Sequence, residues 1–380
     1  MRQRPKVKKR RTVSGHKPDY FLMGTVLIIV LFGLIMLSSA SSVVAFQKFG
    51  DPNYYVKHQF VLGILVGVLG FLIISKIDYH HWKRLAVPLL VFTFILLFLV
   101  FMPGVGFGYG GAKRWIALGG YTFQPSELAK LTFIIYLAAW LEKRGEVIKD
   151  LKHGLLPFVI LLGSVASLII FQPDMGTMLS LVVSSVAVFF VAGAPFAHLA
   201  LIGAGGASLM FLLIKLAPYR AARLTIFLNP EIDPQGIGYH INQALLAIGS
   251  GGIFGLGLGH SRQKFNYLPE VAGDSIFAVI AEELGFMFSV LLIVLFLILM
   301  LRGFRIARAA PDKFGKFLAV GITSWFVFQA LINIGTMTSI LPLTGIPLPF
   351  ISYGSSALMI SLVAFGILIN ISRYTKLRND

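Results

Sequence analysis

The chain has 380 residues, of which 57% are hydrophobic and 13% are charged, with a mean hydropathy of +0.83 and a formal net charge of +17. Because a soluble domain carries roughly 25% charged residues, this composition excludes a soluble globular protein. Cysteine is absent, which excludes disulfide scaffolds, cysteine-ligated zinc sites and thiol catalysis.

Ten apolar stretches are each close to the roughly 20 residues that a helix needs to cross a bilayer. In chain order they occupy residues 20–46, 56–75, 85–102, 126–141, 154–171, 175–193, 196–214, 275–301, 317–341 and 351–371. They use more than half of the chain and leave no room for a separate water-soluble catalytic domain. We therefore expect an all-α polytopic membrane protein of about ten transmembrane helices, forming one membrane domain over residues 20–371.

The longest segment between predicted spans covers residues 217–273, between spans seven and eight, and is rich in Gly and Pro. It is long enough only for an elaborated loop. Within it, the run GSGGIFGLGLG (249–259) predicts tight backbone packing or a re-entrant turn, because glycines allow backbones to approach closely.

The distribution of Lys and Arg predicts that both chain ends are cytoplasmic. Eight of the 33 basic residues lie in residues 1–19, and 23 of the 33 lie in this tail and in the other segments that ten crossings would leave in the cytoplasm. Basic residues near span ends mark the cytoplasmic side, so residues 1–19 and 372–380 are predicted cytoplasmic tails and the 217–273 loop is predicted to be extracytoplasmic. We interpret the basic N-terminus as a topology determinant attracted to anionic lipids, and we expect no nucleic-acid partner.

Charged residues at membrane depth are costly, which makes each one a candidate site residue. Glu127 and Lys130 begin the fourth predicted span, just after Pro125, which favours a helix start. Their three-residue spacing places them on one helix face, close enough to pair. Two interpretations remain open: a salt bridge that holds two charges in the bundle, or a direct role with substrate.

Asp274 immediately precedes the eighth predicted span. The spacing alone favours a helix N-cap, whereas the alternative is a general base at the mouth of a cavity near the outer membrane boundary. Glu282 and Glu283 lie about 12 to 13 Å further along the same predicted helix and point about 100° apart. They cannot both face lipid, so at least one is expected to bond inside the bundle.

Several other patterns are excluded. The G-x-G-x-x-G match at residues 106–111 follows a predicted membrane helix and precedes no βαβ unit, so it does not indicate a dinucleotide site. The sequence has no Walker lysine motif and no His-Glu-x-x-His pattern, and its His residues lack convincing metal-ligand spacing. No metal-ligating residue is therefore predicted, and a divalent cation would supplement the basic side chains without being required.

Six runs of sequence together resemble the motifs of the FtsW/RodA/SpoVE family, also called SEDS proteins. They are GAKRWIALGGYTFQPSELAKL, FQPDMGT, YRAARLTIFLNP, GYHINQALLAIGSGGIFGLGLGHSRQKFNYLPE, DSIFAVIAEELGF and TGIPLPFISYGSSAL. The resemblance spans most of the chain, and GHSRQKFNYLPE looks more like FtsW than RodA. Two departures are visible: Ala272-Gly273 stands where the family commonly has His-Thr, and the SYGSS run lacks one glycine.

The resemblance implies a ten-helix peptidoglycan glycosyltransferase that polymerises lipid II outside the cytoplasmic membrane, during division or cell-shape maintenance. It also implies a class B penicillin-binding protein as the cross-linking partner, with membrane lipids, the nascent glycan strand and other divisome or elongasome proteins as further partners. The family's essential aspartate falls on Asp274, which reverses the preference for an N-cap.

Transfer from a lipid pyrophosphate needs a base for the acceptor 4-hydroxyl and positive charge for the departing pyrophosphate. Asp274 is the predicted base. The predicted substrate-binding residues are Arg114, Glu127, Lys130, Arg220 and Lys264. For the basic residues, the alternative is snorkelling to the outer interface. Alternative functions are a lipid II flippase or another transporter, and a noncatalytic division scaffold.

Overall fold

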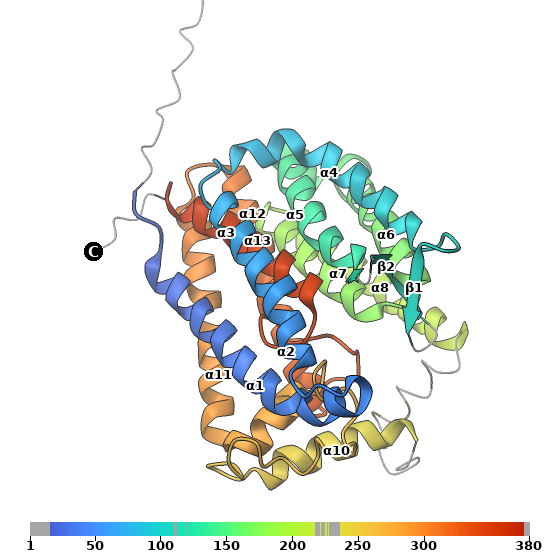
Figure 1. Cartoon of the computed structure of the whole chain (residues 1–380). Helices are drawn as coiled ribbons and strands as arrows, with labels where there is room; N and C mark the ends of the chain where they lie inside the picture. The colour runs from blue at the N-terminus through green and yellow to red at the C-terminus, as the bar shows by residue number, and fades with distance from the viewer. Residues whose placement is uncertain are drawn as a thin grey trace, which may run out of the picture.

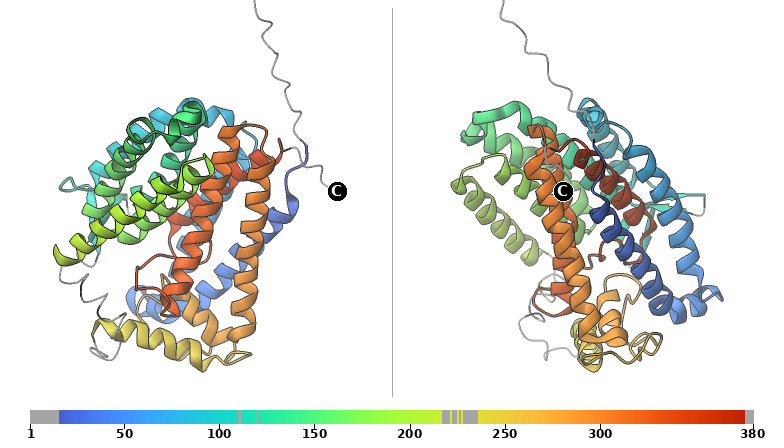
Figure 2. Two further views of the ribbon diagram at one scale, coloured as in Figure 1. Left: turned by 180° about the vertical axis from the view of Figure 1, so that it is seen from behind. Right: turned by 90° about the vertical axis from the view of Figure 1, so that its left-hand side faces the viewer.

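The computed structural model describes residues 16–109, 112–119, 121–216 and 236–375, together with residues 221, 225 and 227. Most of the basic tail (1–15), the end of the C-terminal tail (376–380) and Arg220 lie outside the described residues. The described chain folds into one helical bundle whose two chain ends lie together: the His16 amide donates to the Arg373 carbonyl at 2.8 Å. The start of α1 and the end of α13 lie at the end of the bundle opposite helix α10 (Figures 1 and 2). We call the end that carries α10 the loop end.

Each of the ten predicted spans coincides with a helix. These are α1 (Tyr20–Phe49), α2 (Tyr54–His58) continuing through η1 (Gln59–Leu65) into α3 (Val66–Ile74), α4 (His80–Leu99), α5 (Pro125–Arg144), η3 (Leu151–Leu155) continuing into α6 (Leu156–Phe171), α7 (Met175–Val191), α8 (Phe196–Leu216), α11 (Ile276–Ala309), α12 (Lys313–Met337) and α13 (Ser355–Ser372). Seven helices of the described chain are long and apolar enough to cross a membrane, and α7 and residues 196–212 of α8 form shorter apolar helices. The protein is thus a multi-pass membrane protein, and the exact number of ten crossings stays a prediction.

Helix α12 forms the centre of the bundle and packs against α11, α7 and α5. In its most apolar stretch of 18 residues, 83% of the residues are buried. In contrast, only 22% of the residues in the most apolar 18-residue stretch of α4 are buried, and its exposed side carries large apolar side chains. Apolar residues on the outside of a bundle face lipid, so burial distinguishes α12 from α4 although their mean hydropathies, 1.8 and 1.9, are similar.

A small antiparallel sheet at the end of α4 is the main element that the all-α prediction missed. Its strands are β1 (Gly106–Tyr109), β2 (Ala112–Leu118) and β3 (Tyr121–Phe123), in the order β1-β2-β3. Ile116 pairs with Gly106 on one side and with Phe123 on the other. The sheet lies beside the first turns of α5 and α7 (Figure 1), where it positions the charged residues of β2.

The segment between the seventh and eighth predicted spans contains helix α10 (Ile237–Ser250), which lies across the loop end of the bundle (Figure 1). The glycine-rich run after it packs directly on α11, as the sequence predicted. A Cβ at Gly251 would lie 1.9 Å from the Ala281 carbonyl oxygen, and one at Gly255 would lie 2.2 Å from that of Glu283. Only glycine fits at these two positions.

The eighth predicted span coincides with α11, but α11 is not one straight helix, and the sequence did not predict its bend. Gly285 takes φ 76° and ψ −172° inside α11, which divides it into two helical segments that meet at a bend. A Cβ at Gly285 would lie 2.3 Å from the Gly255 amide nitrogen. After the bend, the amides of Phe286 and Met287 bond to the carbonyls of the glycine-rich run, at Gly252 and Ile253.

Candidate active site

Asp274 lies just before α11, in a position where its carboxylate faces the segment that leads to α13. Helix α11 begins at Ile276 with Ser275 at the N-cap position, so Asp274 stands one residue outside the cap. A Cβ at Gly345 would lie 3.7 Å from Asp274 Oδ2, and only 9% of Asp274 is exposed. The aspartate is therefore held in the bundle beside residues 344–349.

The backbone around Asp274 is fixed by hydrogen bonds from α12 and from the residues before α13. Asn333 Nδ2 donates to the Asp274 carbonyl at 2.8 Å. Asn333 is four residues from Met337, the last residue of α12, which places this contact about 6 Å below that end of the helix. The Asp274 site therefore lies about one helical turn from the end of α12 that is nearer the loop end of the bundle.

The two residues before Asp274 form hydrogen bonds through backbone atoms, and the Gly273 amide itself donates to the Glu270 carbonyl at 2.9 Å. Ser352 Oγ donates to the Gly273 carbonyl at 2.7 Å, and the Tyr353 amide donates to the Ala272 carbonyl at 2.8 Å. Because these bonds need no side chain at either position, the Ala-Gly pair found here supports the same backbone arrangement that larger residues would.

Glu127 and Lys130 form the ion pair that their spacing predicted, with 2.9 Å between Lys130 Nζ and Glu127 Oε1. Both side chains are at least 97% buried, and the Lys130 ammonium lies 4.7 Å from the Trp325 ring centroid. Lys130 Nζ also donates to Gln329 Oε1 at 2.9 Å. This pairing confirms the geometry that both interpretations share, and it does not decide between them.

Residues 344–349 join the ion pair to Asp274. Gln329 Nε2 donates to the Pro347 carbonyl at 2.9 Å, and Asn333 Nδ2 donates to the Ile346 carbonyl at 2.7 Å. Gln329 thus contacts both Lys130 and this segment, whereas Asn333 contacts both the segment and Asp274. Two side chains of α12 and residues 344–349 therefore link Asp274 to the Glu127–Lys130 ion pair.

Arg114 lies on β2 and bonds to the connection between α6 and α7. Its guanidinium donates to the Gln172 carbonyl at 3.3 Å and also to the Pro173 carbonyl. Asp174, the next residue, accepts from Gln124 Nε2 at 3.0 Å and Ser126 Oγ at 3.2 Å. The sheet, the start of α5 and the start of α7 are thereby tied together beside the ion pair.

Sequence reasoning assigned no role to four polar residues of this site: Gln124, Asp174, Gln329 and Asn333. The first two lie in the motifs FQPSE and FQPD, and these motifs were the available signal. Ser126 is the second residue of α5, which begins at Pro125, and its hydroxyl donates to Asp174.

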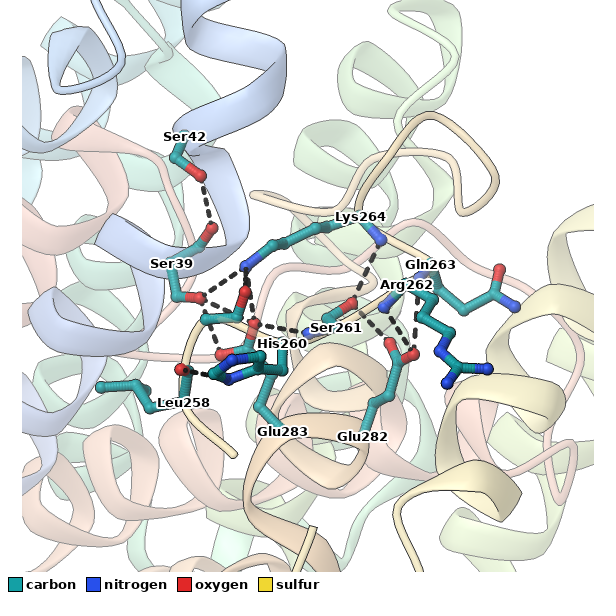
Figure 3. Close-up of polar contacts among 11 residues, drawn as sticks. Ser39, Ser42, Leu258, His260, Ser261, Arg262, Gln263, Lys264, Glu282 and Glu283 are labelled. Carbon is teal, nitrogen blue, oxygen red and sulfur yellow. Dashed lines mark hydrogen bonds and ion pairs between the residues drawn. The ribbon is translucent and has the colours of Figure 1, made fainter. Parts of the chain in front are cut away.

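Lys264 lies in a second polar cluster, with Glu283 as its ion-pair partner at 2.9 Å (Figure 3). Its ammonium also donates to the Gly259 carbonyl at 2.7 Å and to Ser39 Oγ at 3.1 Å, and Lys264 is 3% exposed. The Lys264 ammonium therefore has three partners within the protein.

Glu282 belongs to the same cluster and holds the turn that carries Lys264 (Figure 3). Its carboxylate accepts from Ser261 Oγ at 2.5 Å and from the Arg262 amide at 2.9 Å. Glu282 and Glu283 are thus both bonded inside the bundle, as predicted for at least one of them. They lie at the opposite end of the first α11 segment from Asp274, about 12 to 13 Å along the helix.

No group of three or more His, Asp or Glu side chains that could hold a metal ion occurs in the part of the chain that the structure describes. The candidate site therefore consists of one aspartate, one buried ion pair and the arginine of β2, with uncharged donors between them. Arg220, the remaining predicted residue, is outside the described ranges.

The family model described as "Cell cycle protein", FtsW/RodA/SpoVE, matches residues 19–377. The chain belongs to this family. It is 44% identical to stage V sporulation protein E of Bacillus subtilis over 365 residues, covering 96% of this chain and 100% of that protein. It is also 44% identical to the probable peptidoglycan glycosyltransferase FtsW of Trichlorobacter lovleyi, covering 94% of each.

Solved structures of this FtsW/RodA/SpoVE family share the fold. A chain from a structure described as "Structural coordination of polymerization and crosslinking by a peptidoglycan synthase complex" has a TM-score of 0.79 and 29% identity, covering 95% of this chain and 99% of that one. The rod shape determining protein RodA of Thermus thermophilus has a TM-score of 0.68 and 29% identity, covering 95% and 98%. The expected family and its helical membrane fold are both confirmed.

Proposed function

We propose that this chain is a peptidoglycan glycosyltransferase that extends glycan strands from lipid II, with Asp274 as its general base. The observation that carries the proposal is the position of Asp274. It is a largely buried residue about one turn from the end of α12, and residues 344–349 link it to a buried lysine. The relatives named peptidoglycan glycosyltransferase support the reaction class.

In the proposed orientation, the loop end is extracytoplasmic and both tails are cytoplasmic. The cluster of Lys and Arg in residues 1–19 supports this, because basic residues near span ends stay on the cytoplasmic side. The site then lies at the outer face of the cytoplasmic membrane, where a lipid-linked sugar can keep its polyprenyl tail among the lipids and present its head-group to Asp274.

The proposed reaction is a single displacement. Asp274 accepts the proton of the acceptor sugar's 4-hydroxyl, and that oxygen forms a bond to the anomeric carbon of the donor. The bond between this carbon and the pyrophosphate oxygen breaks, and its electron pair leaves with the polyprenyl pyrophosphate. The aspartate thus ends the step protonated and returns its proton to water.

Positive charge beside the leaving pyrophosphate would stabilise the transition state. We propose that Lys130 and Arg114 supply it, because Lys130 is linked to Asp274 through Gln329 and residues 344–349, and Arg114 bonds to the connection between α6 and α7. Glu127 would hold the Lys130 ammonium in place. We propose that Lys264 does not bind substrate directly but holds the outer loop in place, since its ammonium contacts Glu283, Ser39 and Gly259 within the protein.

The proposed partner is a cross-linking class B penicillin-binding protein. Support comes from the structural relative that belongs to a synthase complex coordinating polymerization and crosslinking. Purified protein should therefore be assayed both alone and with such a transpeptidase.

The test gives the protein fluorescently labelled lipid II and resolves the glycan products by length. Asp274→Asn should abolish polymer while keeping a monodisperse elution profile and the parental melting temperature. Glu146→Gln, a carboxylate-to-amide change on the exposed surface, serves as the matched control and should polymerise normally. Polymer made by a folded Asp274→Asn variant at the parental rate would refute the base, and lipid movement across vesicles without polymer would indicate a transporter.

A further inference from the structure

A group of six aromatic rings lies at the loop end, next to the residues that hold Asp274. The rings come from the end of α1, from α2, from strand β3 and from the segment just before α13. Its members, here called the aromatic cluster, are Phe49, Tyr54, Tyr55, His58, Tyr121 and Tyr353.

The rings form a connected series of contacts. Phe49 stacks on Tyr54, with ring centroids 3.8 Å apart, and Tyr55 meets Tyr353 edge-on at 4.6 Å. The His58 ring lies 6.2 Å from that of Tyr121. Three stretches that are distant in sequence, around residues 49–58, 121 and 353, therefore meet through their aromatic side chains.

The aromatic cluster is joined to the Asp274 site through one residue. The Tyr353 amide donates to the Ala272 carbonyl at 2.8 Å, two residues before Asp274. The Tyr353 hydroxyl lies 3.0 Å from His58 Nδ1, so the same residue also contacts the rings of α2. Tyr353 therefore contacts both the backbone that leads to Asp274 and the aromatic cluster.

Two rings at the margins of the aromatic cluster are open to their surroundings: Tyr121 is 54% exposed and Phe49 is 47% exposed. Polar groups lie beside them, since Ser355 Oγ is 3.1 Å from His58 Nδ1 and Ser356 Oγ donates to the Thr122 carbonyl at 3.2 Å. Flat rings beside hydroxyl groups suit a saccharide, whose ring hydrogens pack on the negative face of an aromatic ring while its hydroxyls form hydrogen bonds.

We propose that the aromatic cluster is a saccharide-binding subsite, where a sugar of the glycan strand stacks on Tyr121 while the strand's reacting sugar occupies the Asp274 site. The proposal rests on the proposed function for the identity of the saccharide. The competing explanation is an aromatic belt, in which Tyr residues anchor a membrane protein at the lipid–water interface. The two differ in what they require at residue 121.

The first experiment measures binding of a soluble tetrasaccharide of alternating N-acetylglucosamine and N-acetylmuramic acid to the full detergent-solubilised chain by saturation-transfer NMR titration. Tyr121→Leu keeps an apolar side chain and removes the flat ring, so we expect about five-fold weaker binding. Tyr121→Trp should bind at least as well as the parent. Phe107→Leu is the matched control, because Phe107 is 49% exposed on β1 of the same sheet and should leave binding unchanged.

The second experiment compares the glycan products of the same variants with labelled lipid II. Tyr121→Leu should give strands about five-fold shorter than the parent, while Tyr121→Trp and Phe107→Leu give parental lengths. If Tyr121→Leu matched the parent in both binding and strand length, the subsite would be refuted and the aromatic belt supported. If the parent bound the tetrasaccharide through Tyr121 but made no polymer, the subsite would stand and the proposed glycosyltransferase function would fail.

Discussion

Gln329 and Asn333, one turn apart on α12, donate to the consecutive carbonyls of Pro347 and Ile346. The same two amides reach Lys130 and the backbone of Asp274, respectively. Residues that are 144 positions apart in sequence, 130 and 274, are thus held to one rigid segment by two uncharged side chains. The catalytic proposal depends on this arrangement, because a base must be kept in place relative to the charge that stabilises the leaving group.

Asn333→Ala should therefore lower both stability and activity. It removes the donor to two buried carbonyls, and a buried polar group left without a partner costs about 1 to 3 kcal/mol. Thermal unfolding and the lipid II assay measure the two effects. Ser208→Ala on the exposed face of α8, which loses only a bond to its own helix, is the control and should change neither. Parental values for Asn333→Ala would show that this side chain does not hold Asp274.

The two interpretations of the Glu127–Lys130 ion pair make different predictions for a double variant. Removing one partner, as in Lys130→Met, leaves a buried charge uncompensated and should cost about 3 to 5 kcal/mol of stability. Glu127→Gln combined with Lys130→Met leaves no buried charge, so much of that stability should return. If Lys130 acts on the pyrophosphate, the stable double variant stays inactive, and a double variant with parental polymerisation would assign the pair a purely structural role.

Lys264 provides a test of the loop attachment, because it pairs with Glu283 in the buried cluster. Lys264→Met should increase amide hydrogen exchange in residues 251–264, since the ammonium joins that loop to α1 and α11. Lys149→Met is the matched control: it breaks an exposed lysine–carboxylate pair, with 61% of the lysine side chain accessible, and should leave exchange unchanged. If residues 251–264 exchanged equally in both variants, the proposal that Lys264 attaches this loop to α1 and α11 would be wrong.

The sequence predicted helix positions well because a membrane helix satisfies its own backbone hydrogen bonds, so each span is a local property of about 20 residues. The Glu127–Lys130 pairing was also local, being set by the three-residue spacing on α5. In contrast, the partners Gln329 and Asn333 required knowledge of which helix packs beside which. The β-sheet was missed because its strands are short and pair only with one another.

The bend at Gly285 was also missed, and it gives the sharpest steric prediction. Gly285→Ala should prevent correct folding, because φ 76° disfavours a side chain and its Cβ would lie 2.3 Å from the Gly255 amide nitrogen. Gly249→Ala is the matched control: its Cβ would meet nothing within 4 Å, and alanine favours helix at this position in α10. Both variants are compared by membrane expression and by the melting temperature of purified protein.

Loss of the folded protein for Gly285→Ala alone is expected, because the first α11 segment would no longer meet the glycine-rich run and could not hold Asp274 against residues 344–349. A Gly285→Ala protein that melted and polymerised like the parent would show that Asp274 does not depend on this bend.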